Sequence, residues 1–412
     1  MLRDRRLVAL LVAETVSTTG SQMTWLALPW FVLTTTGSAG RMVLVLLAEA
    51  LGLILAGIPG GSLLERLGSR RTMLLADGVR VPLTLAIPIL HWAGALSFPL
   101  LLGLVFAIGA CTTPHFAAQR AIVPDLIGED ETLVSKANAY LQTATRVTML
   151  LGPAIAGFLI AWIGAPSVIV VDAVTFAASF ALVAAFVRAT RETRPAEERG
   201  RFFDGLKFVV RDPLLRSWSV GFIAGDAAWM AFFAAVPVLV VAEYGADPRI
   251  AGWIFASFGV GAVLGNFASM RLHDRVDGLL LIGTLVYGQA LPLWALCFHL
   301  PPVAISATLF VSGIFNGLVN PSIHALFTLR APPEIRARVL GALVTVLMLS
   351  SPLGLAFAGP VLSASGARPV LVGFAAVQTA AMTLVSVVSL RARSAEPRPR
   401  ALPARSPSTS AN

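Results

Sequence analysis

The chain has 412 residues, of which 56% are hydrophobic and 13% are charged, and its mean hydropathy is +0.80. Because a soluble domain carries about a quarter charged residues, this composition excludes most soluble classes, as well as disordered, collagen-like and coiled-coil chains. The formal charge of +9 would suggest nucleic-acid binding in a soluble protein, but here it lies between long apolar runs, so we expect no nucleic-acid partner. Cys111 and Cys297 lie inside such runs, which predicts neither a disulfide nor a metal site, and we expect no cofactor.

Apolar runs long enough to cross a bilayer follow one another along the whole chain. Because lipid offers a free backbone no hydrogen-bond partner and the runs do not alternate with period two, we predict an all-α membrane protein rather than a barrel. The first run is too long for the core of a signal peptide, so we expect it to be retained. The twelve predicted helices are residues 7–33, 42–63, 72–92, 98–118, 138–163, 166–188, 216–242, 249–270, 279–299, 302–328, 338–361 and 369–390.

Positive charge is distributed unevenly over the segments that join these helices. Of the 31 Lys and Arg residues, 26 lie in the amino-terminal segment, in alternate loops and in the tail, whereas only Arg41, Arg249 and Arg368 lie in the opposite loops. The positive-inside rule places the Arg-rich side in the cytoplasm. We therefore predict an even number of spans in the inner membrane, with both termini cytoplasmic.

Short motifs recur at an offset close to half the chain length, between 202 and 208 residues. The matched positions are Gly61 with Gly265, Arg41 with Arg249, Pro114 with Pro321, and Gly164 with Gly366. We expect both prolines to end their helices. The repeats predict two pseudo-symmetric six-helix bundles, residues 1–188 and 216–390.

The segment between the predicted bundles, residues 189–215, is strongly basic. Its second part places Phe203, Leu206 and Val210 on one helical face, which predicts an amphipathic helix on the cytoplasmic membrane surface, and a solvated linker is the alternative. The tail, residues 391–412, is rich in Arg, Pro and Ser and is predicted to be disordered.

The loop after the second predicted helix carries a recognisable pattern of glycines and charges, formed by Gly61, Glu65, Arg66, Gly68, Arg70 and Arg71. It resembles the signature loop of the major facilitator superfamily, although glutamate replaces the usual aspartate at position 65 and Ser69 replaces a base. Gly152-Pro153 with Gly157 is similar to the Gly-Pro motif of the proton-coupled exporters in that superfamily. Residues 123–127 and 205–216 resemble its macrolide-efflux branch of drug and metabolite exporters.

These motifs also have a direct physical interpretation. Glycines allow close approach of helices, and a Gly-Pro pair weakens the local hydrogen-bond ladder, so the fifth predicted helix could bend or seal against a neighbour as a gate. Ordinary tight packing is the alternative. For the charged loop, the alternative is that its bases only determine topology.

Seven ionisable residues fall within predicted spans, where each costs about 2.5–3.5 kcal/mol by insertion scales and is a functional candidate. They are Glu14, Glu49, Asp77, Arg80, Arg146, Asp172 and Asp226. Asp226 is the deepest acid, about 15 Å into its helix. Glu14 and Arg146 have similar depth and could pair, so that protonation and pairing would compete. Asp77 and Arg80 are one turn apart and are expected to pair structurally with each other or with the signature loop.

Aromatic and amide side chains provide candidates for substrate contacts. Gln22 and Trp25 share a face of the first predicted helix, and Asp226, Trp229 and Phe233 share a face of the seventh. Such faces could line a cavity in which flat, apolar or cationic molecules stack, although packing roles are equally compatible with the pattern. Asn316 and Asn320, four residues apart in the tenth predicted helix, are further candidates.

The sequence therefore predicts a secondary transporter that exports a hydrophobic small molecule in exchange for protons by alternating access. Its expected partners are that substrate, protons and the lipid bilayer, and we expect a monomer. Proton coupling is predicted at Glu14 or Asp226, with Arg146, Glu49 and Asp172 as further candidates. A facilitator or importer of a metabolite, and a non-transporting sensor or assembly protein, remain alternatives. No nucleophile motif or phosphate-binding loop appears in the sequence, so we expect neither an enzyme nor an ATP-driven pump.

Overall fold

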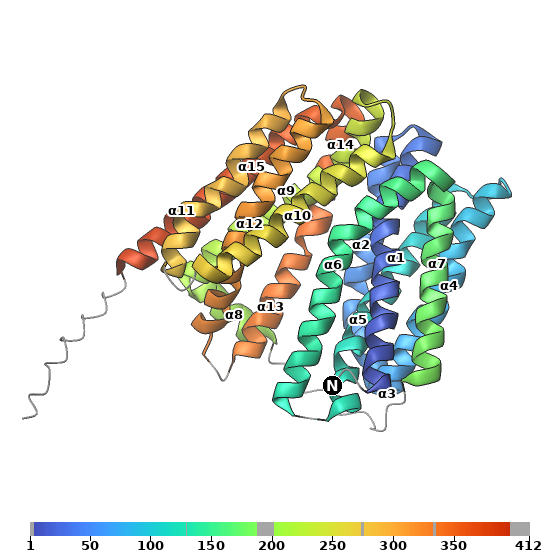
Figure 1. The fold of residues 1–412 in the computed structure, drawn as a ribbon, viewed down its shortest axis with the longest axis horizontal. Helices are drawn as coiled ribbons and strands as arrows, with labels where there is room; N and C mark the ends of the chain where they lie inside the picture. Colours follow the sequence, from blue (N-terminus) through green and yellow to red (C-terminus); the bar gives the residue numbers. More distant parts are fainter. Residues whose placement is uncertain (1–3, 129, 188–201, 273–275, 333–334, 396–412) are drawn as a thin grey trace, which may run out of the picture.

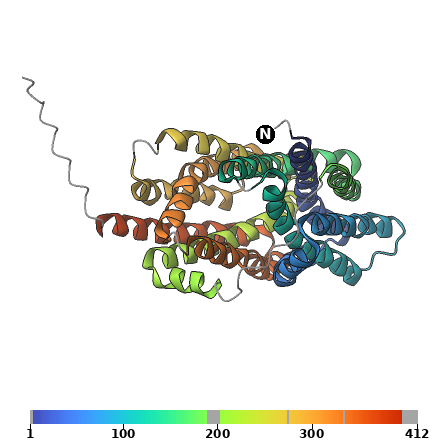
Figure 2. The ribbon, with the colours of Figure 1, turned by 90° about the horizontal axis from the view of Figure 1, so that it is seen from below.

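The computed structural model describes residues 4–128, 130–187, 202–272, 276–332 and 335–395, and every regular element among them is helical. The helices form two groups that lie side by side (Figures 1 and 2). The first half contains α1 (Arg5–Thr36), α2 (Ala39–Leu55), α3 (Gly57–Leu67), α4 (Ser69–Trp92), α5 (Phe98–Ile127), α6 (Glu131–Ile163) and α7 (Ala165–Phe186). The second half contains α8 (Phe202–Arg211), α9 (Pro213–Glu243), α10 (Pro248–Leu272), α11 (Gly278–Ala290), η2 (Leu291–Cys297), α12 (Pro302–Arg330), α13 (Arg336–Met348), α14 (Ser350–Ser365) and α15 (Ala367–Ala395).

Each of the twelve predicted spans coincides with one helix or with two consecutive helices. Nine helical segments in the described part of the chain are long and apolar enough to cross a membrane. Three predicted spans are divided in the structure. Residues 42–63 break at Ala56, residues 338–361 break at Leu349, and residues 279–299 continue beyond Ala290 as a 3₁₀ helix.

Two local expectations were wrong. Pro114 and Pro321 do not end their helices but lie inside α5 and α12, because neighbouring helices in a membrane bundle tolerate an internal proline. Helix α15 continues to Ala395, so the predicted tail begins later than residue 391. The rest of the tail and residues 188–201 of the predicted linker lie outside the described residues.

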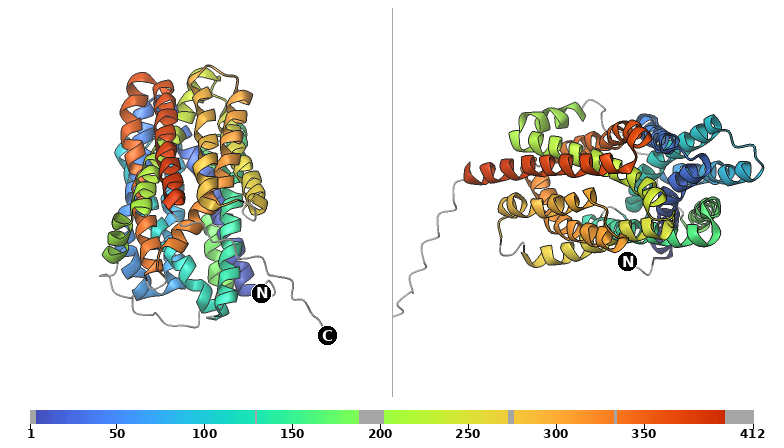
Figure 3. Two further views of the ribbon diagram at one scale, coloured as in Figure 1. Left: turned by 90° about the vertical axis from the view of Figure 1, so that its left-hand side faces the viewer. Right: turned by 90° about the horizontal axis from the view of Figure 1, so that it is seen from above.

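Several helices begin at the same end of the bundle with an aspartate as N-cap. The carboxylates of Asp4, Asp130, Asp212 and Asp277 accept hydrogen bonds of 2.8–3.0 Å from backbone amides in the first turns of α1, α6, α9 and α11. An acid at this position satisfies free amides and interacts favourably with the helix dipole. This end also carries the basic segments beside α3, α8 and α13, and we call it the basic end (Figures 1 and 3).

Helix α8 belongs to the basic end of the second half, and its packing differs from the sequence prediction. Val209 is buried, and a Cβ added at Gly205 would lie 2.3 Å from the carbonyl oxygen of Arg338 in α13. Val210, which was expected on the apolar face, is 51% exposed. The helix therefore packs on protein through the face that carries Gly205 and Val209, since close approach to α13 decides its rotation.

The two halves repeat the same close helix crossing. In the first half, a Cβ at Gly109 of α5 would lie 2.3 Å from the Glu49 carbonyl of α2. In the second half, a Cβ at Gly313 of α12 would lie 2.2 Å from the Phe258 carbonyl of α10. Only glycine allows backbones to approach this closely, which is a common device of membrane helices.

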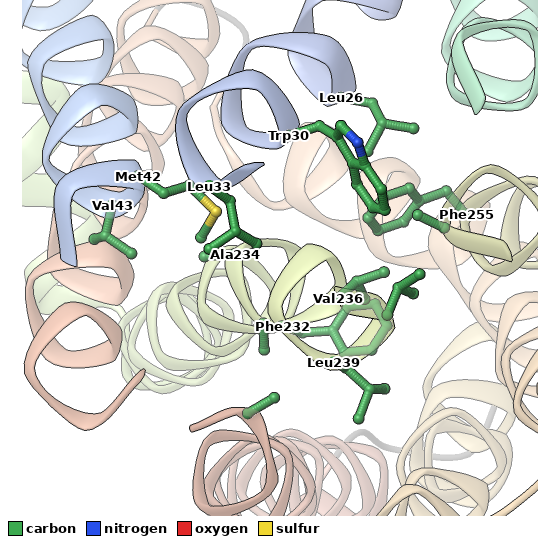
Figure 4. Close-up of a cluster of buried hydrophobic side chains, with 14 of the residues drawn as sticks. Leu26, Trp30, Leu33, Met42, Val43, Phe232, Ala234, Val236, Leu239 and Phe255 are labelled. Carbon is green, nitrogen blue, oxygen red and sulfur yellow. The ribbon is translucent and has the colours of Figure 1, made fainter. Parts of the chain in front are cut away.

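The described apolar core consists of three clusters, and their positions reveal how the halves meet. One cluster joins both halves near the end opposite the basic end, where Leu33 and Met42 of the first half lie beside Ala234 of the second (Figure 4). The other two clusters lie toward the basic end, and each is confined to one half. Within the described residues, the halves are therefore packed together at the opposite end and share no apolar cluster at the basic end.

Candidate functional site

A small cavity of about 180 Å³ lies between the two halves. The first half contributes Trp25 and Glu49, and the second contributes Met230, Phe233 and Phe255. The Trp25 ring meets the Phe233 ring edge to face, with centroids 4.7 Å apart, and lies 5.7 Å from the Phe255 ring. The contact between halves is thus aromatic, with one carboxylate beside it.

A larger cavity of about 400 Å³ lies within the second half and shares Met230 and Phe233 with the first cavity. It brings together the candidates Asp226, Trp229, Phe233, Asn316 and Asn320, which come from α9 and α12. Asp226 is exposed to this space, whereas Trp229 is buried among Phe258 and Phe374 at centroid distances of 4.5 and 4.9 Å.

Further polar residues of this cavity escaped the sequence analysis. They are Gln289 of α11, Ser350 of α14 and Gln378 of α15. Each lies in a largely apolar stretch, so no local pattern indicates it. A lone carboxylate beside aromatic rings and neutral amides is suited to an organic cation, because the rings and the acid attract positive charge and the amides orient polar groups.

A second group of polar residues is closed inside the first half. His115 Nε2 lies 3.0 Å from Glu14 Oε1, and His115 Nδ1 lies 3.1 Å from Asp77 Oδ1. Gln119 Nε2 donates to Glu14 Oε2 at 2.7 Å, and Ser179 Oγ donates to Asp77 Oδ2 at 2.8 Å. We call this group, completed by Arg80, the buried network.

Arg80 is held within the buried network from two sides. It pairs with Asp77, one turn earlier on α4, and its guanidinium lies 4.2 Å from the centroid of the Phe176 ring. The pairing of Asp77 with Arg80 was expected from their spacing. The contribution of His115 was not, because its partners come from other helices.

The ion pair considered between Glu14 and Arg146 does not form in the described structure. Glu14 is 3% exposed and bonds to His115 and Gln119, whereas Arg146 is exposed on α6, where it interacts electrostatically with His324. Equal depth in two helices does not imply facing sides, and α6 turns Arg146 away from α1.

Glu49 and Asp172 are two further acids of the first half, near the 180 Å³ cavity between the halves (the central cavity) and the buried network. Glu49 lines the cavity, and Asp172 of α7 is buried with Thr175 Oγ1 at 3.3 Å from its Oδ1. A Cβ at Gly20 of α1 would lie 2.4 Å from that same Oδ1, so glycine makes room for the carboxylate. The ionised carboxylates of Glu49 and Asp172 repel each other, and Arg80 attracts that of Asp172.

The signature loop connects α3 to α4 at the basic end. Gly61, Glu65 and Arg66 lie in α3, and Gly68 turns the chain with a φ of +76°. Arg70 donates hydrogen bonds to the carbonyl oxygens of Ala184 and Val187, at the end of α7. The loop thus ties α4 to α7 by capping free carbonyl groups.

The Gly-Pro motif lies in α6 at its contacts with α1 and with the second half. A Cβ at Gly152 would lie 2.4 Å from the Gln22 Cβ in α1. A Cβ at Gly157 would lie 2.7 Å from the Pro248 carbonyl oxygen of α10, and a Cβ at Gly252 of α10 would lie 2.9 Å from the Pro153 carbonyl oxygen. The motif therefore forms part of the seam between halves, near the closed end.

Comparisons with known proteins agree with this architecture. A family described as transmembrane secretion effector, within the major facilitator superfamily, matches residues 2–408. The chain is 26% identical over 381 residues to the multidrug efflux pump Tap of Mycolicibacterium fortuitum, covering 87% of this chain and 90% of that one. It is 25% identical over 388 residues to an uncharacterised MFS-type transporter of Sinorhizobium fredii, covering 92% and 94%.

Solved structures resemble the fold at low sequence identity. A bacterial homologue of the human lysosomal transporter Spinster, in an inward-facing and unoccupied conformation, superimposes with a TM-score of 0.72 at 15% identity, covering 93% of this chain and 96% of that one. The nucleoside transporter NupG superimposes with a TM-score of 0.71 at 11% identity, covering 93% and 98%. These likenesses support the fold alone.

Proposed function

This chain belongs to the transmembrane secretion effector family of the major facilitator superfamily, a family of membrane transporters, and we propose that it exports hydrophobic cationic small molecules in exchange for protons. The observation that carries the proposal is the 400 Å³ cavity, where Asp226 lies exposed beside Trp229, Phe233 and neutral amides. A flat cation would stack on the rings and neutralise the carboxylate. The similarity to multidrug efflux pumps supports the direction of transport.

We further propose that the two halves, residues 1–188 and 216–390, rock about the seam between them. The separate apolar clusters at the basic end support a state that opens there, and the shared cluster supports closure at the opposite end. The distribution of arginine supports a cytoplasmic basic end in the inner membrane, with both termini on that side. Glu14 and Asp226 are the principal proton-coupling candidates, with Glu49, Asp172 and Arg146 as further candidates.

The proposal is tested with ethidium, a planar aromatic cation, in everted membrane vesicles. An imposed acid-inside pH gradient should drive ethidium into vesicles that contain the protein, and an ionophore that collapses the gradient should release it. Asp226→Asn should lower accumulation by roughly tenfold, equivalent to about 1.4 kcal/mol of lost interaction. Asp277→Asn is the matched control, because it removes an exposed acid while asparagine keeps the N-cap of α11.

The outcomes separate the alternatives. Accumulation that stops at equilibrium and ignores the pH gradient would indicate a facilitator. Uphill movement in the reverse direction would indicate an importer. Absence of ethidium movement by the unsubstituted protein would contradict the proposal and favour a sensor or assembly role.

A further inference from the structure

The buried network ties together four helices of the first half. Its six side chains are Glu14 from α1, Asp77 and Arg80 from α4, His115 and Gln119 from α5, and Ser179 from α7. The most accessible of them, Gln119, is only 7% exposed. Hydroxyl and amide groups can hold membrane helices together at a much lower free-energy cost than charged groups. A buried cluster of acids and bases therefore indicates a function in addition to helix packing.

His115 lies between two carboxylates, and this placement favours an additional proton on the group. A neutral imidazole has one N–H and one lone pair, so one of its nitrogens would set a lone pair against a carboxylate oxygen. Nε2 hydrogen-bonds to Glu14 Oε1 at 3.0 Å, whereas Nδ1 lies 3.1 Å from Asp77 Oδ1 without forming a hydrogen bond. The second contact is therefore electrostatic, and it is favourable when the three groups hold one additional proton. That proton resides on the imidazole or on one of the two acids.

The charges of the surrounding groups lead to the same result. The groups that act electrostatically on His115 are Glu14 from α1 and Asp77 and Arg80 from α4, and Cys111 on α5 faces the same Asp77–Arg80 pair. With a neutral histidine, two carboxylates and one guanidinium leave an uncompensated negative charge. Burying such a charge costs several kcal/mol, so loss of the proton weakens the packing of α5 against α1 and α4.

The buried network is connected to the central cavity through other titratable groups. Glu49 lines the cavity, Asp172 interacts with it, and Arg80 interacts with both Asp172 and Asp77. All of these residues lie in the first half, and the electrostatic effects extend from Glu49 at the cavity wall to the Asp77–Arg80 pair beside His115. Asp226 stands apart, because it is in the second half and opens to the other cavity.

Helix α1 provides a mechanical link between the buried network and the seam. Trp25 is eleven residues after Glu14, about 16 Å along the helix, and packs edge to face on Phe233 of the second half. A change in how α1 is held at Glu14 therefore reaches the contact between halves.

We infer that the Glu14–His115–Asp77 group is the proton site of the exchange, with His115 as its central residue, and that Asp226 instead holds the cationic substrate. This assignment rests on the proposed function. One proton binds to the group from water on one side and returns to water on the other, and its departure frees α1 from α5. The first half thus binds the proton, and the second half binds the cationic substrate.

The test compares two assays of ethidium movement in proteoliposomes. Accumulation driven by a pH gradient requires the proton site, whereas counterflow of labelled against unlabelled ethidium does not. His115→Gln and Glu14→Gln should abolish gradient-driven accumulation and flatten its pH profile, while counterflow stays within about twofold of the unsubstituted protein. Asp226→Asn should lower both gradient-driven accumulation and counterflow by roughly tenfold.

Two controls separate proton binding from packing. Gln119→Leu breaks the bond to Glu14 without removing a titratable group, and it should keep the pH profile even if the rate falls. His324→Gln removes an exposed histidine elsewhere and should change neither assay. Normal gradient-driven accumulation by His115→Gln, or a flat pH profile in Gln119→Leu equal to that of His115→Gln, would overturn the inference while leaving the proposed function intact.

A measurement on a chain with an intact buried network covers the case in which the His115 and Glu14 variants do not fold. In the His324→Gln protein labelled with ¹⁵N-histidine, ethidium binding should convert one histidine from the doubly to the singly protonated form, or release one proton per ethidium from an adjacent acid. Binding with neither change would reject the assignment. Failure of the unsubstituted protein to move ethidium in either assay would contradict the proposed function itself.

Discussion

The two halves share one arrangement of helices, but the charges of the first half are buried and paired, whereas Asp226 of the second half is exposed. The first half closes Glu14, Asp77 and Arg80 into a network with His115, where every charge has a partner. The second half leaves Asp226 exposed in a cavity among aromatic rings and amides. A buried charge must be compensated by other groups of the protein, whereas a charge that faces a cavity is available to pair with a bound ligand. The same fold therefore provides a closed site and an open one.

Removing one charge from each half should have the largest and most unequal effects. Arg80→Leu should destabilise the protein by about 3–5 kcal/mol, because it leaves Asp77 buried without its ion-pair partner. Asp226→Leu should change stability by less than about 1 kcal/mol, because its carboxylate is exposed. Thermal unfolding in detergent measures both, and equal losses would mean that the two halves do not differ in this respect.

The next largest effect concerns the helix crossing that the halves have in common. Gly109→Ala and Gly313→Ala should each cost about 1–3 kcal/mol, because the new Cβ would collide with a backbone carbonyl of the adjacent helix. Gly103→Ala on α5 is the matched control, since nothing lies within 4 Å of a Cβ there. A tolerated Gly313→Ala beside a destabilising Gly109→Ala would show that only the first half depends on the crossing.

An effect of similar size is expected where the halves touch. Trp25→Leu removes the aromatic contacts with Phe233 and Phe255, which contribute about 0.5–1.5 kcal/mol each to closure of the end opposite the basic end. Together the two contacts are worth about 1–3 kcal/mol, so opening at that end should rise by roughly 5- to 150-fold. The rate at which an impermeant maleimide labels Asn320→Cys from that side, in a background without the two native cysteines, measures the change. An unchanged labelling rate would show that Trp25 does not stabilise the contact between the halves.

The smallest effect is expected from an ion pair at the surface. Arg393 Nε lies 3.5 Å from Asp277 Oδ1, and both side chains are about half exposed. Arg393→Gln should therefore change the free energy of unfolding by no more than about 0.2–1 kcal/mol. A loss comparable to that of Arg80→Leu would show that burial is not what separates the two kinds of pair.

Local features of the fold were predictable from the chain. The long apolar runs and the arginine distribution predict membrane helices, and each predicted span coincides with one or two helices. Residues three or four apart in a helix share a face, so Asp77 and Arg80 pair, and Asp226, Trp229 and Phe233 border one cavity. Whether the candidate residues bind substrate or protons remains a prediction.

The composition of the amino-acid chain determined that this protein spans a membrane as a repeated set of helices, and short-range spacing determined which neighbours along a helix lie together. Only the tertiary structure decided that His115 bridges Glu14 and Asp77, that Arg146 turns away from Glu14, and that α8 buries Val209 instead of Val210. The reason is physical. A membrane helix is apolar both toward lipid and toward its neighbours, so its hydrophobic pattern does not report its rotation, and contacts between helices a hundred residues apart depend on that rotation.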